Sequence, residues 1–115
     1  MAYTKSPMRG VEVVVHAAGT SATGRGQVLA VPNSFRRHKF TVKTSAGVAS
    51  GAVQPECAEE SDYAGTWAPI GGGPVTVPAA SASLIIEFEG VYNFLACRIS
   101  TIIGGGTIEV IYEGS

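Results

Sequence analysis

Residues 84–101 read LIIEFEGVYNFLACRIST, and this stretch decides which class of fold the chain adopts. Apolar side chains occupy alternate positions from Leu84 to Phe88, with glutamates in between toward the end of the run. An apolar residue at every second position is typical of a β-strand that has one face against a core. We expect Gly90 to form a tight turn or bulge that leads into a second apolar run. The stretch therefore predicts two consecutive strands.

The same alternation recurs along the chain between segments rich in glycine, serine, threonine and proline. About seven or eight short strands separated by such turn signals are typical of an antiparallel β-sandwich, and here we expect a jelly-roll-like one. Pro55 cannot donate to a strand ladder, so it predicts an edge position or a bulge. Besides the two strands above, we expect strands at residues 11–16, 27–31, 35–44, 52–58 and 107–112.

Length and composition indicate one all-β domain, residues 11–115, preceded by a possible arm at residues 1–10. The chain has 115 residues, 45% of them hydrophobic and only 15% charged, with 15 glycines. No apolar run approaches the roughly 20 residues of a membrane helix, and the first residues lack a secretory signal. We therefore expect synthesis in the cytoplasm, with the two cysteines, Cys57 and Cys97, as buried thiols.

Charge is unevenly distributed along the chain. Residues 1–46 hold seven basic residues against one acidic residue, a balance of +6, and residues 47–115 hold one against eight, a balance of −7. This asymmetry predicts two surfaces that complement a neighbouring subunit. Nucleic-acid binding by the basic residues 36–39 is not favoured, because the pI of about 6.1 is far from that of a basic domain.

The segment 56–73, ECAEESDYAGTWAPIGGG, concentrates acidic residues, but the chain offers no partners that would complete a catalytic set. No serine has the spacing of a nucleophile elbow, and the glycine runs lack the lysine of a phosphate loop. The expectation is no catalytic residue, no cofactor and no metal. Two weaker alternatives are a glycosidase pair drawn from these carboxylates and a calcium ion, whose ligands would be Glu56, Glu59, Glu60 and Asp62.

Two signatures in the last two-thirds of the chain resemble small β-sandwich proteins of tailed-phage virions. In that family an outgoing strand with an acidic, tryptophan-containing turn precedes a strand with an arginine and a glycine-led hairpin. The turn is longer here, with the glycine three positions after the aspartate. The first signature comprises Glu56, Ser61, Asp62, Gly65, Trp67 and Ile70, and the second comprises Gly90, Arg98, Gly105, Gly106 and Gly114.

The resemblance implies a non-enzymatic structural protein located in the virion and assembled in the host cytoplasm. Decoration or cementing of the capsid is the expected role, with a head-fibre or tail-associated position as variants. The expected partners are the major capsid protein and further copies of the chain, with a trimer slightly favoured, and neither nucleic acid nor membrane. The candidate assembly contacts are Lys5, Arg9, Arg36, Arg37, Lys39, Glu59 and Glu60.

Within the acidic segment we expect a structural turn, in which Asp62 and Gly65 shape the backbone and Trp67 anchors the returning chain in or beside the core. The alternative is a carbohydrate-binding or host-surface-binding module of a tail or fibre. Its platform would be Asp62, Tyr63 and Trp67, because aromatic faces and carboxylates suit sugars.

Overall fold

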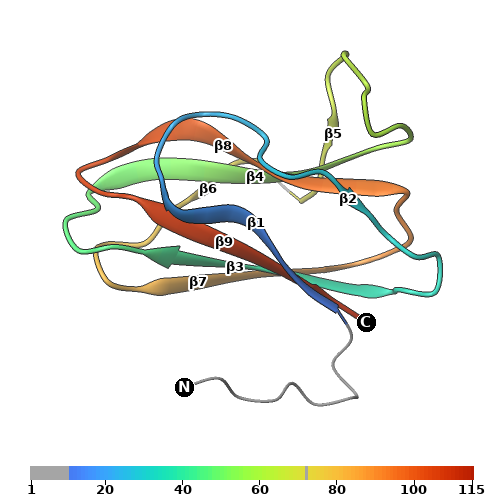
Figure 1. Cartoon of the computed structure of the whole chain (residues 1–115), viewed down its shortest axis with the longest axis horizontal. Coiled ribbons are helices and arrows are strands. Elements are labelled where there is room, and N and C mark those ends of the chain that lie inside the picture. Colours follow the sequence, from blue (N-terminus) through green and yellow to red (C-terminus); the bar gives the residue numbers. More distant parts are fainter. Residues whose placement is uncertain (1–10, 72) are drawn as a thin grey trace.

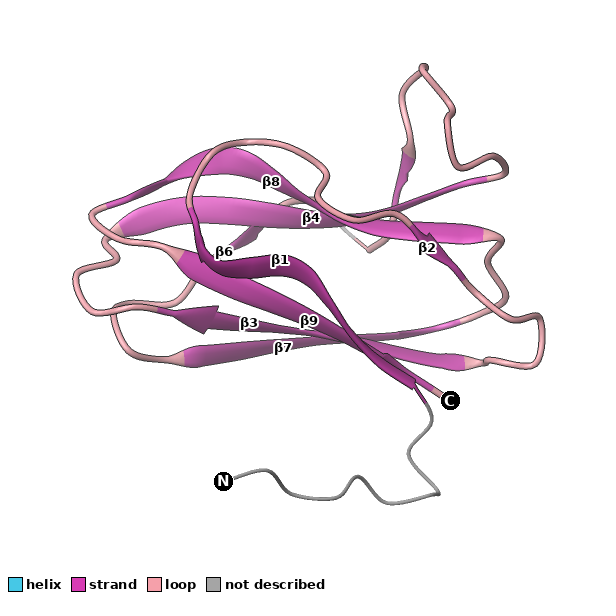
Figure 2. Cartoon of the chain, viewed as in Figure 1, coloured by secondary structure: helices cyan, strands magenta, loops and turns pink. Residues whose placement is uncertain are grey.

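The computed structural model describes residues 11–71 and 73–115 as an all-β sandwich of two antiparallel sheets (Figure 1). Within these residues strands and connecting loops make up the whole chain (Figure 2), and no helix has the length and apolarity that a membrane span requires. The predicted fold class is confirmed. The strands are β1 (Val11–Thr20), β2 (Leu29–Ala30), β3 (Arg37–Thr44), β4 (Ser50–Ala58), β5 (Ala68–Pro69), β6 (Val75–Thr76), β7 (Ser83–Glu89), β8 (Phe94–Gly104) and β9 (Ile108–Gly114).

The strand order is that of a jelly roll. One sheet has the order β1-β9-β3-β7, and the other has the order β2-β8-β4-β5, with β6 also paired to β4. Because β5 and β6 pair with the same strand, the nine described strands occupy eight positions, in keeping with the seven or eight expected. Strands β1 to β4 and β7 to β9 alternate between the two layers, so nearly every connection crosses from one sheet to the other.

The core lies between the two sheets and is built by the period-two pattern of the sequence. In β3, Phe40 and Val42 are fully buried, while Lys39 and Lys43 lie on the outer face. Strand β7 alternates in the same way, with its outer face exposed. The buried core cluster comprises Val15, Leu29, Val31, Phe40, Val42, Val48, Val53, Val77, Leu95, Cys97, Ile99, Ile103, Ile108, Val110 and Tyr112.

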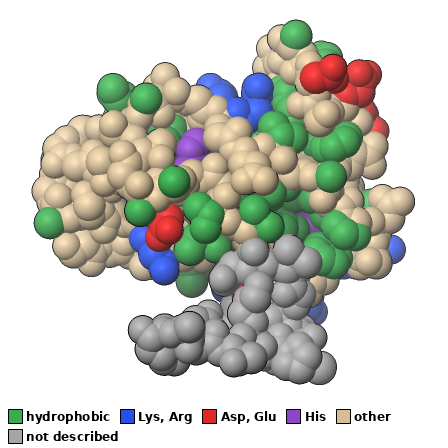
Figure 3. Space-filling view, in the orientation of Figure 1, with side chains coloured by type: hydrophobic (Ala, Val, Ile, Leu, Met, Phe, Trp, Pro, Cys, Tyr) green, Lys and Arg blue, Asp and Glu red, His purple; other side chains and the backbone are tan. Residues whose placement is uncertain are grey.

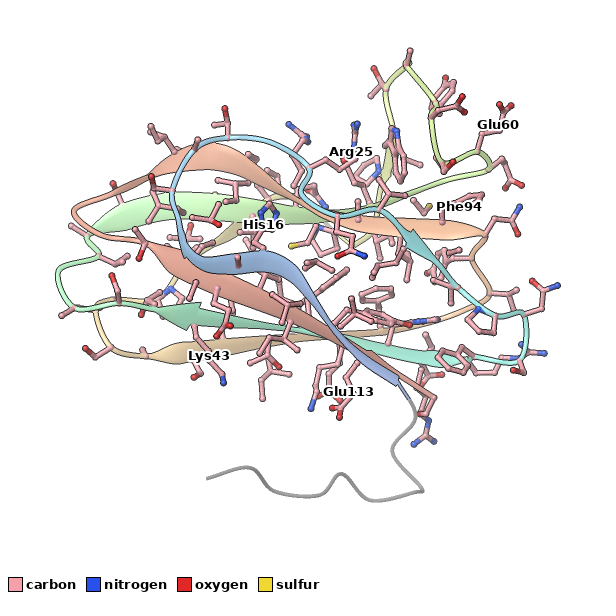
Figure 4. The ribbon with its side chains drawn as sticks, in the orientation of Figure 1. His16, Arg25, Lys43, Glu60, Phe94 and Glu113 are labelled. Carbon is pink, nitrogen blue, oxygen red and sulfur yellow. The ribbon has the colours of Figure 1, made fainter. Side chains whose placement is uncertain are left out.

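Strand β1 departs from the predicted alternation, because a register shift follows Val14 and lets consecutive residues turn inward. Val14 is 45% exposed, whereas His16, two positions later in the predicted strand, is only 5% exposed. Its Nε2 donates a hydrogen bond to the carbonyl oxygen of Cys97 in β8, at 2.5 Å. Figure 4 shows His16 lying between the two layers. The side chain therefore joins the edge strand of one sheet to the backbone of the other.

Pro55 was predicted at an edge or a bulge, and this prediction is wrong. It is fully buried in β4, between β8 and the strands β5 and β6, and the register shifts of β4 occur nearer Ser50. The carbonyl oxygen of Pro55 accepts a hydrogen bond from the backbone N–H of Ile70. Because the nitrogen and the carbonyl of one strand residue point to the same side, the proline nitrogen, which carries no hydrogen, also faces Ile70. There the side-chain amide of Gln54 donates to the carbonyl oxygen of Ile70 at 3.2 Å and replaces the absent donor.

Two turns differ in how they use glycine. Gly90, with φ of 136°, leads from β7 to β8, but these strands lie in different sheets, so the connection is a crossover and not a hairpin turn. Gly105, with φ of 85°, provides a positive φ in the turn before β9. A Cβ atom on Gly105 would lie 2.2 Å from the carbonyl oxygen of Gly47 in the turn between β3 and β4, so these two turns touch through their backbones.

Candidate functional site

The acidic segment 56–73 divides into a buried part and an exposed part. Strand β4 ends at Ala58, and the following loop, residues 59–67, stands out from the sandwich before the chain returns as β5 (Figure 1). Figure 3 shows acidic side chains gathered over this loop, and Glu60 points away from the molecule in Figure 4. Glu56 is only 2% exposed, whereas Glu59, Glu60 and Asp62 are exposed, so the four carboxylates do not converge.

Glu56 is held by two arginines on the outer face of its sheet. Arg25 Nε donates to Glu56 Oε1 at 2.5 Å, and Arg98 Nε donates to Glu56 Oε2 at 3.2 Å. The side chains of Arg25 and Arg98 remain 31% and 43% exposed. Both carboxylate oxygens are thus engaged by opposite charges. This arrangement is a structural clamp, because the carboxylate has a partner on each of its two oxygens.

Trp67 completes this clamp from the loop side. It is 2% exposed, and the guanidinium of Arg25 lies 4.5 Å from the centroid of its ring. The indole Nε1 donates to the backbone carbonyl oxygen of Tyr63 at 3.0 Å. Trp67 is absent from the core cluster between the sheets, so it anchors the loop beside the core. A ring this buried cannot be the face of a sugar platform, which corrects the alternative that included Trp67.

The other expected turn residues have different positions. Asp62 is exposed at the tip of the loop. Gly65 does not have a positive φ, so the expected relief of backbone strain is not its role. Instead, a Cβ atom at Gly65 would lie 2.4 Å from the ring of Tyr63, so glycine leaves room for that ring. The loop therefore depends on Gly65 to position a side chain rather than to reverse the backbone.

A pocket of about 510 Å³ lies between this loop and the crossover from β7 to β8. Tyr63 belongs to the loop wall, Tyr92 and Asn93 to the crossover wall, and Cys57 comes from β4. Asn93 Nδ2 donates to Glu59 Oε2 at 2.5 Å, which ties the two walls together. The pocket combines two tyrosines with a carboxylate and an amide, groups that can bind a polar ligand with apolar faces.

Two titratable groups of the pocket, Cys57 and Tyr92, have raised pKa values. Burial, followed by the nearby carboxylates of Glu59 and Glu56, raises the pKa of the Cys57 thiol. A raised pKa keeps the thiol protonated at neutral pH, and the protonated form is a poor nucleophile. Burial also raises the pKa of Tyr92, whose hydroxyl donates to the carbonyl oxygen of Glu89. The arrangement is therefore suited to binding.

No group of three or more His, Cys, Asp or Glu side chains within residues 11–71 and 73–115 could hold a metal ion. The calcium alternative required Glu56 to join the loop carboxylates, but the two arginines engage it on another side. Cys97 is fully buried and Cys57 half-buried, and both are free thiols. Burial raises the pKa of Cys97 to about 12.

The candidate assembly contacts do not form one surface. Arg36 and Arg37 are exposed at the start of β3, and Lys39 is partly buried in an ion pair with Glu113, with 2.8 Å between Nζ and Oε1. Glu59 and Glu60 lie on the protruding loop of the other sheet. The remaining two contacts, Lys5 and Arg9, lie outside the described residues, as does the expected arm at residues 1–10.

The charge asymmetry of the sequence does not produce one basic and one acidic face within the sheet β1-β9-β3-β7. Basic β3 lies between β7 and β9, which carry four of the eight acidic residues of residues 47–115. The register places Arg37 opposite Glu89 and Lys43 opposite Glu109. Opposite charges on adjacent strands attract within the same sheet. The expectation of separate basic and acidic surfaces is therefore wrong for this sheet.

The sequence singled out Glu56, Trp67 and Arg98, but it did not indicate that Arg25 and Arg98 engage Glu56. Arg25 lies 31 residues before Glu56, and Arg98 lies 42 residues after it. Tyr92 and Asn93 were also missed as a pocket wall. In the sequence, only their position shortly after Gly90 could have indicated them. The fold then places this crossover opposite the acidic loop.

Comparisons with known proteins support the fold. No protein-family model matches the chain, and no curated protein sequence matches it. Among solved structures, the SPBc2 prophage-derived protein YomS superposes with a TM-score of 0.58 at 17% identity, over 91% of this chain and 92% of that one. The Tobacco streak virus coat protein aligns with a TM-score of 0.37 at 10% identity, over 98% and 90% of the two chains. The first alignment shows that the two proteins share a fold. The TM-score of the second alignment is too low to support a comparison of folds.

Proposed function

We propose that this chain is a non-enzymatic structural protein of a phage virion, with decoration or cementing of the head as its role. One observation carries the proposal: the jelly-roll sandwich is shared, over nine-tenths of both chains, with a protein that derives from a prophage. Jelly rolls recur in viral capsid proteins, where two curved sheets present broad faces and loops to neighbouring subunits. The virion signatures noted in the sequence agree with this role.

The protruding loop is the part of the molecule that we expect to contact the capsid shell. Glu59 and Glu60 are exposed on it, and the clamp around Trp67 fastens its base to the sheet. A loop that is ordered before binding loses little conformational entropy when it docks. The partner surface is then a basic patch of the major capsid protein, which the two carboxylates select by charge.

The decisive experiment examines particles produced from the genome that encodes this chain. Quantitative mass spectrometry of purified heads and tails should find the chain in heads, in a copy number set by the capsid lattice. Heads that lack the chain should release their DNA at a lower temperature than complete heads. Adding the purified chain should restore the release temperature of complete heads. Absence from particles, or presence in tails alone, overturns the decoration role.

Charge substitutions test the contact itself. Changing Glu59 and Glu60 together to glutamine should weaken co-sedimentation with heads at least tenfold, since both are exposed and neither supports the core. Glu89→Gln, on the outer face of the other sheet, is the matched control and should bind like the unmodified protein. Equal binding by all three proteins would remove the loop from the interface.

The pocket favours a second candidate, a carbohydrate-binding module of a tail or fibre that contacts the host surface. Its tyrosines, Tyr63 and Tyr92, and the pair formed by Asn93 and Glu59 replace the platform expected from the sequence. Glycan-array binding that Tyr63→Ala abolishes, but that Ile102→Ala on β8 leaves intact, would support this role. No binding to any glycan on the array would exclude it for the sugars tested.

A further inference from the structure

The outer face of the sheet β1-β9-β3-β7 carries a row of three aliphatic side chains and one threonine that crosses all four strands. The register aligns Val14 with Ile111, Ile111 with Thr41, and Thr41 with Ile85. Val14 and Ile85 are 45% and 54% exposed, and the two central residues are partly buried. Exposed apolar side chains that adjoin one another on a sheet form a patch, and such patches mark interaction sites.

Charged residues flank this row on both sides, in pairs of opposite sign. On one side Lys39 of β3 lies opposite Glu113 of β9, and on the other side Lys43 lies opposite Glu109. Figure 4 shows Lys43 and Glu113 on the side of this sheet that faces away from β4 and β8. An apolar centre between charged margins is the usual anatomy of a protein interface.

The arrangement of these charges is complementary to itself. The two central strands, β9 and β3, carry carboxylates on one and amines on the other. Consider two copies that face each other through this sheet, related by a twofold axis that lies midway between them. If the axis runs parallel to the strands and above the gap between β9 and β3, then β9 of each copy lies over β3 of the other. Each Lys43 then faces Glu109 of the partner subunit, while Lys39 and Glu113, which is only 8% exposed, stay paired within each copy. The same rotation places Val14 over Ile85 of the partner subunit.

We propose that two copies of this chain pack face to face through the outer surface of the sheet β1-β9-β3-β7, as an isologous dimer. A twofold interface requires that one patch complement itself, which this face does. The trimer favoured by the sequence has no such support from the charge pattern. The inference does not rest on the virion role, because it depends only on the register and exposure of the four strands.

The size of the face sets the expected strength. Four strands about 4.8 Å apart and about seven residues of about 3.3 Å each give a surface of about 19 by 23 Å. Two such surfaces bury on the order of 1,000 Å² in total, near the lower limit for a specific interface. We therefore expect a reversible dimer that dissociates at micromolar concentrations.

Sedimentation velocity of the full chain over a concentration series measures this association. We expect a shift from the 11.8 kDa monomer to a species of twice that mass. Ile85→Lys should weaken the dimer at least tenfold, while Ile102→Lys should not, although Ile102 on β8 is even more exposed, at 60%. A monomer at all concentrations up to about 1 mM, or equal effects of the two substitutions, overturns the proposal.

A charge exchange between copies tests the twofold register. Lys43→Glu leaves two carboxylates at this pair of positions, and Glu109→Lys leaves two amines, so each variant alone should be monomeric. When the two variants are mixed, every carboxylate of one faces an amine of the other, and the dimer should return. Circular dichroism checks that both variants are folded. A mixture of folded variants that remains monomeric, or dimerisation by either variant alone, would show that copies do not meet in this register.

Discussion

Trp67→Ala should destabilise the protein by about 3–5 kcal/mol, even though the ring lies outside the core between the sheets. A buried aromatic side chain removes about 150–250 Å² from water, which at about 25 cal/mol per Å² amounts to about 4–6 kcal/mol. Loss of the Arg25 contact adds about 0.5–2 kcal/mol. The loop can partly collapse into the vacated space, which recovers some of this energy, so the expected value matches core tryptophan truncations.

Urea unfolding followed by far-UV circular dichroism measures this change, because removal of the single tryptophan also removes the fluorescence signal. Trp67→Phe is the control: it keeps most of the apolar area but loses the hydrogen bond to Tyr63, so it should cost about 1–2 kcal/mol. If Trp67→Ala unfolds within about 1 kcal/mol of the unmodified protein, the clamp does not fasten the loop.

Three further perturbations follow from the backbone, the buried titratable groups and the clamp. Gly105→Ala should lower the free energy of unfolding by about 3 kcal/mol or more, because position 105 has a positive φ and its Cβ atom would clash with the backbone of Gly47. Stability should fall as pH rises from about 9 to 12, because burial raises the pKa values of Cys97 and Tyr112 to about 12. In this range the unfolded chain loses protons that the folded chain retains. Glu56→Gln should cost about 1–3 kcal/mol, since two arginines lose their counter-charge while staying partly exposed to water.

Each of these has a control and a contrary outcome in the same unfolding assay. Gly71 shares the φ of 85° but has open space around it, so Gly71→Ala should cost about 2 kcal/mol less than the change at Gly105. Cys97→Ala should flatten the pH dependence, and an unchanged slope would argue against burial of the thiol. Glu60→Gln should be neutral, and a loss equal to that of Glu56→Gln would contradict the clamp.

The strands with regular alternation could be predicted from the sequence, because their pattern is local. In β3 and β7 each residue's face follows from its neighbours two positions away, and the structure keeps those assignments. The jelly-roll class follows from the number and spacing of such strands. Local pattern is sufficient for these features because period-two burial needs no knowledge of which strands pair.

The exceptions depend on pairing between distant segments, which no local pattern contains. His16 turns inward and donates to the carbonyl oxygen of Cys97 in β8, 81 residues away in sequence. Pro55 fits a central strand because the side chain of Gln54 supplies the donor that proline lacks. In the candidate site, the acidic segment was visible, but the arginines that bury Glu56 come from other strands and loops.

The position of β9 has a consequence for how the chain acquires its structure during synthesis. This strand is translated after the other described strands, yet it lies between β1 and β3 and hydrogen-bonds to both. Until residues 108–114 leave the ribosome, β1 has no neighbour in its sheet, and the apolar inner face of β3 is only partly covered. Sandwiches dominated by such long-range pairing fold slowly. The nascent chain therefore exposes aggregation-prone strand edges until its final strand inserts, and chaperone dependence should be greatest just before that step.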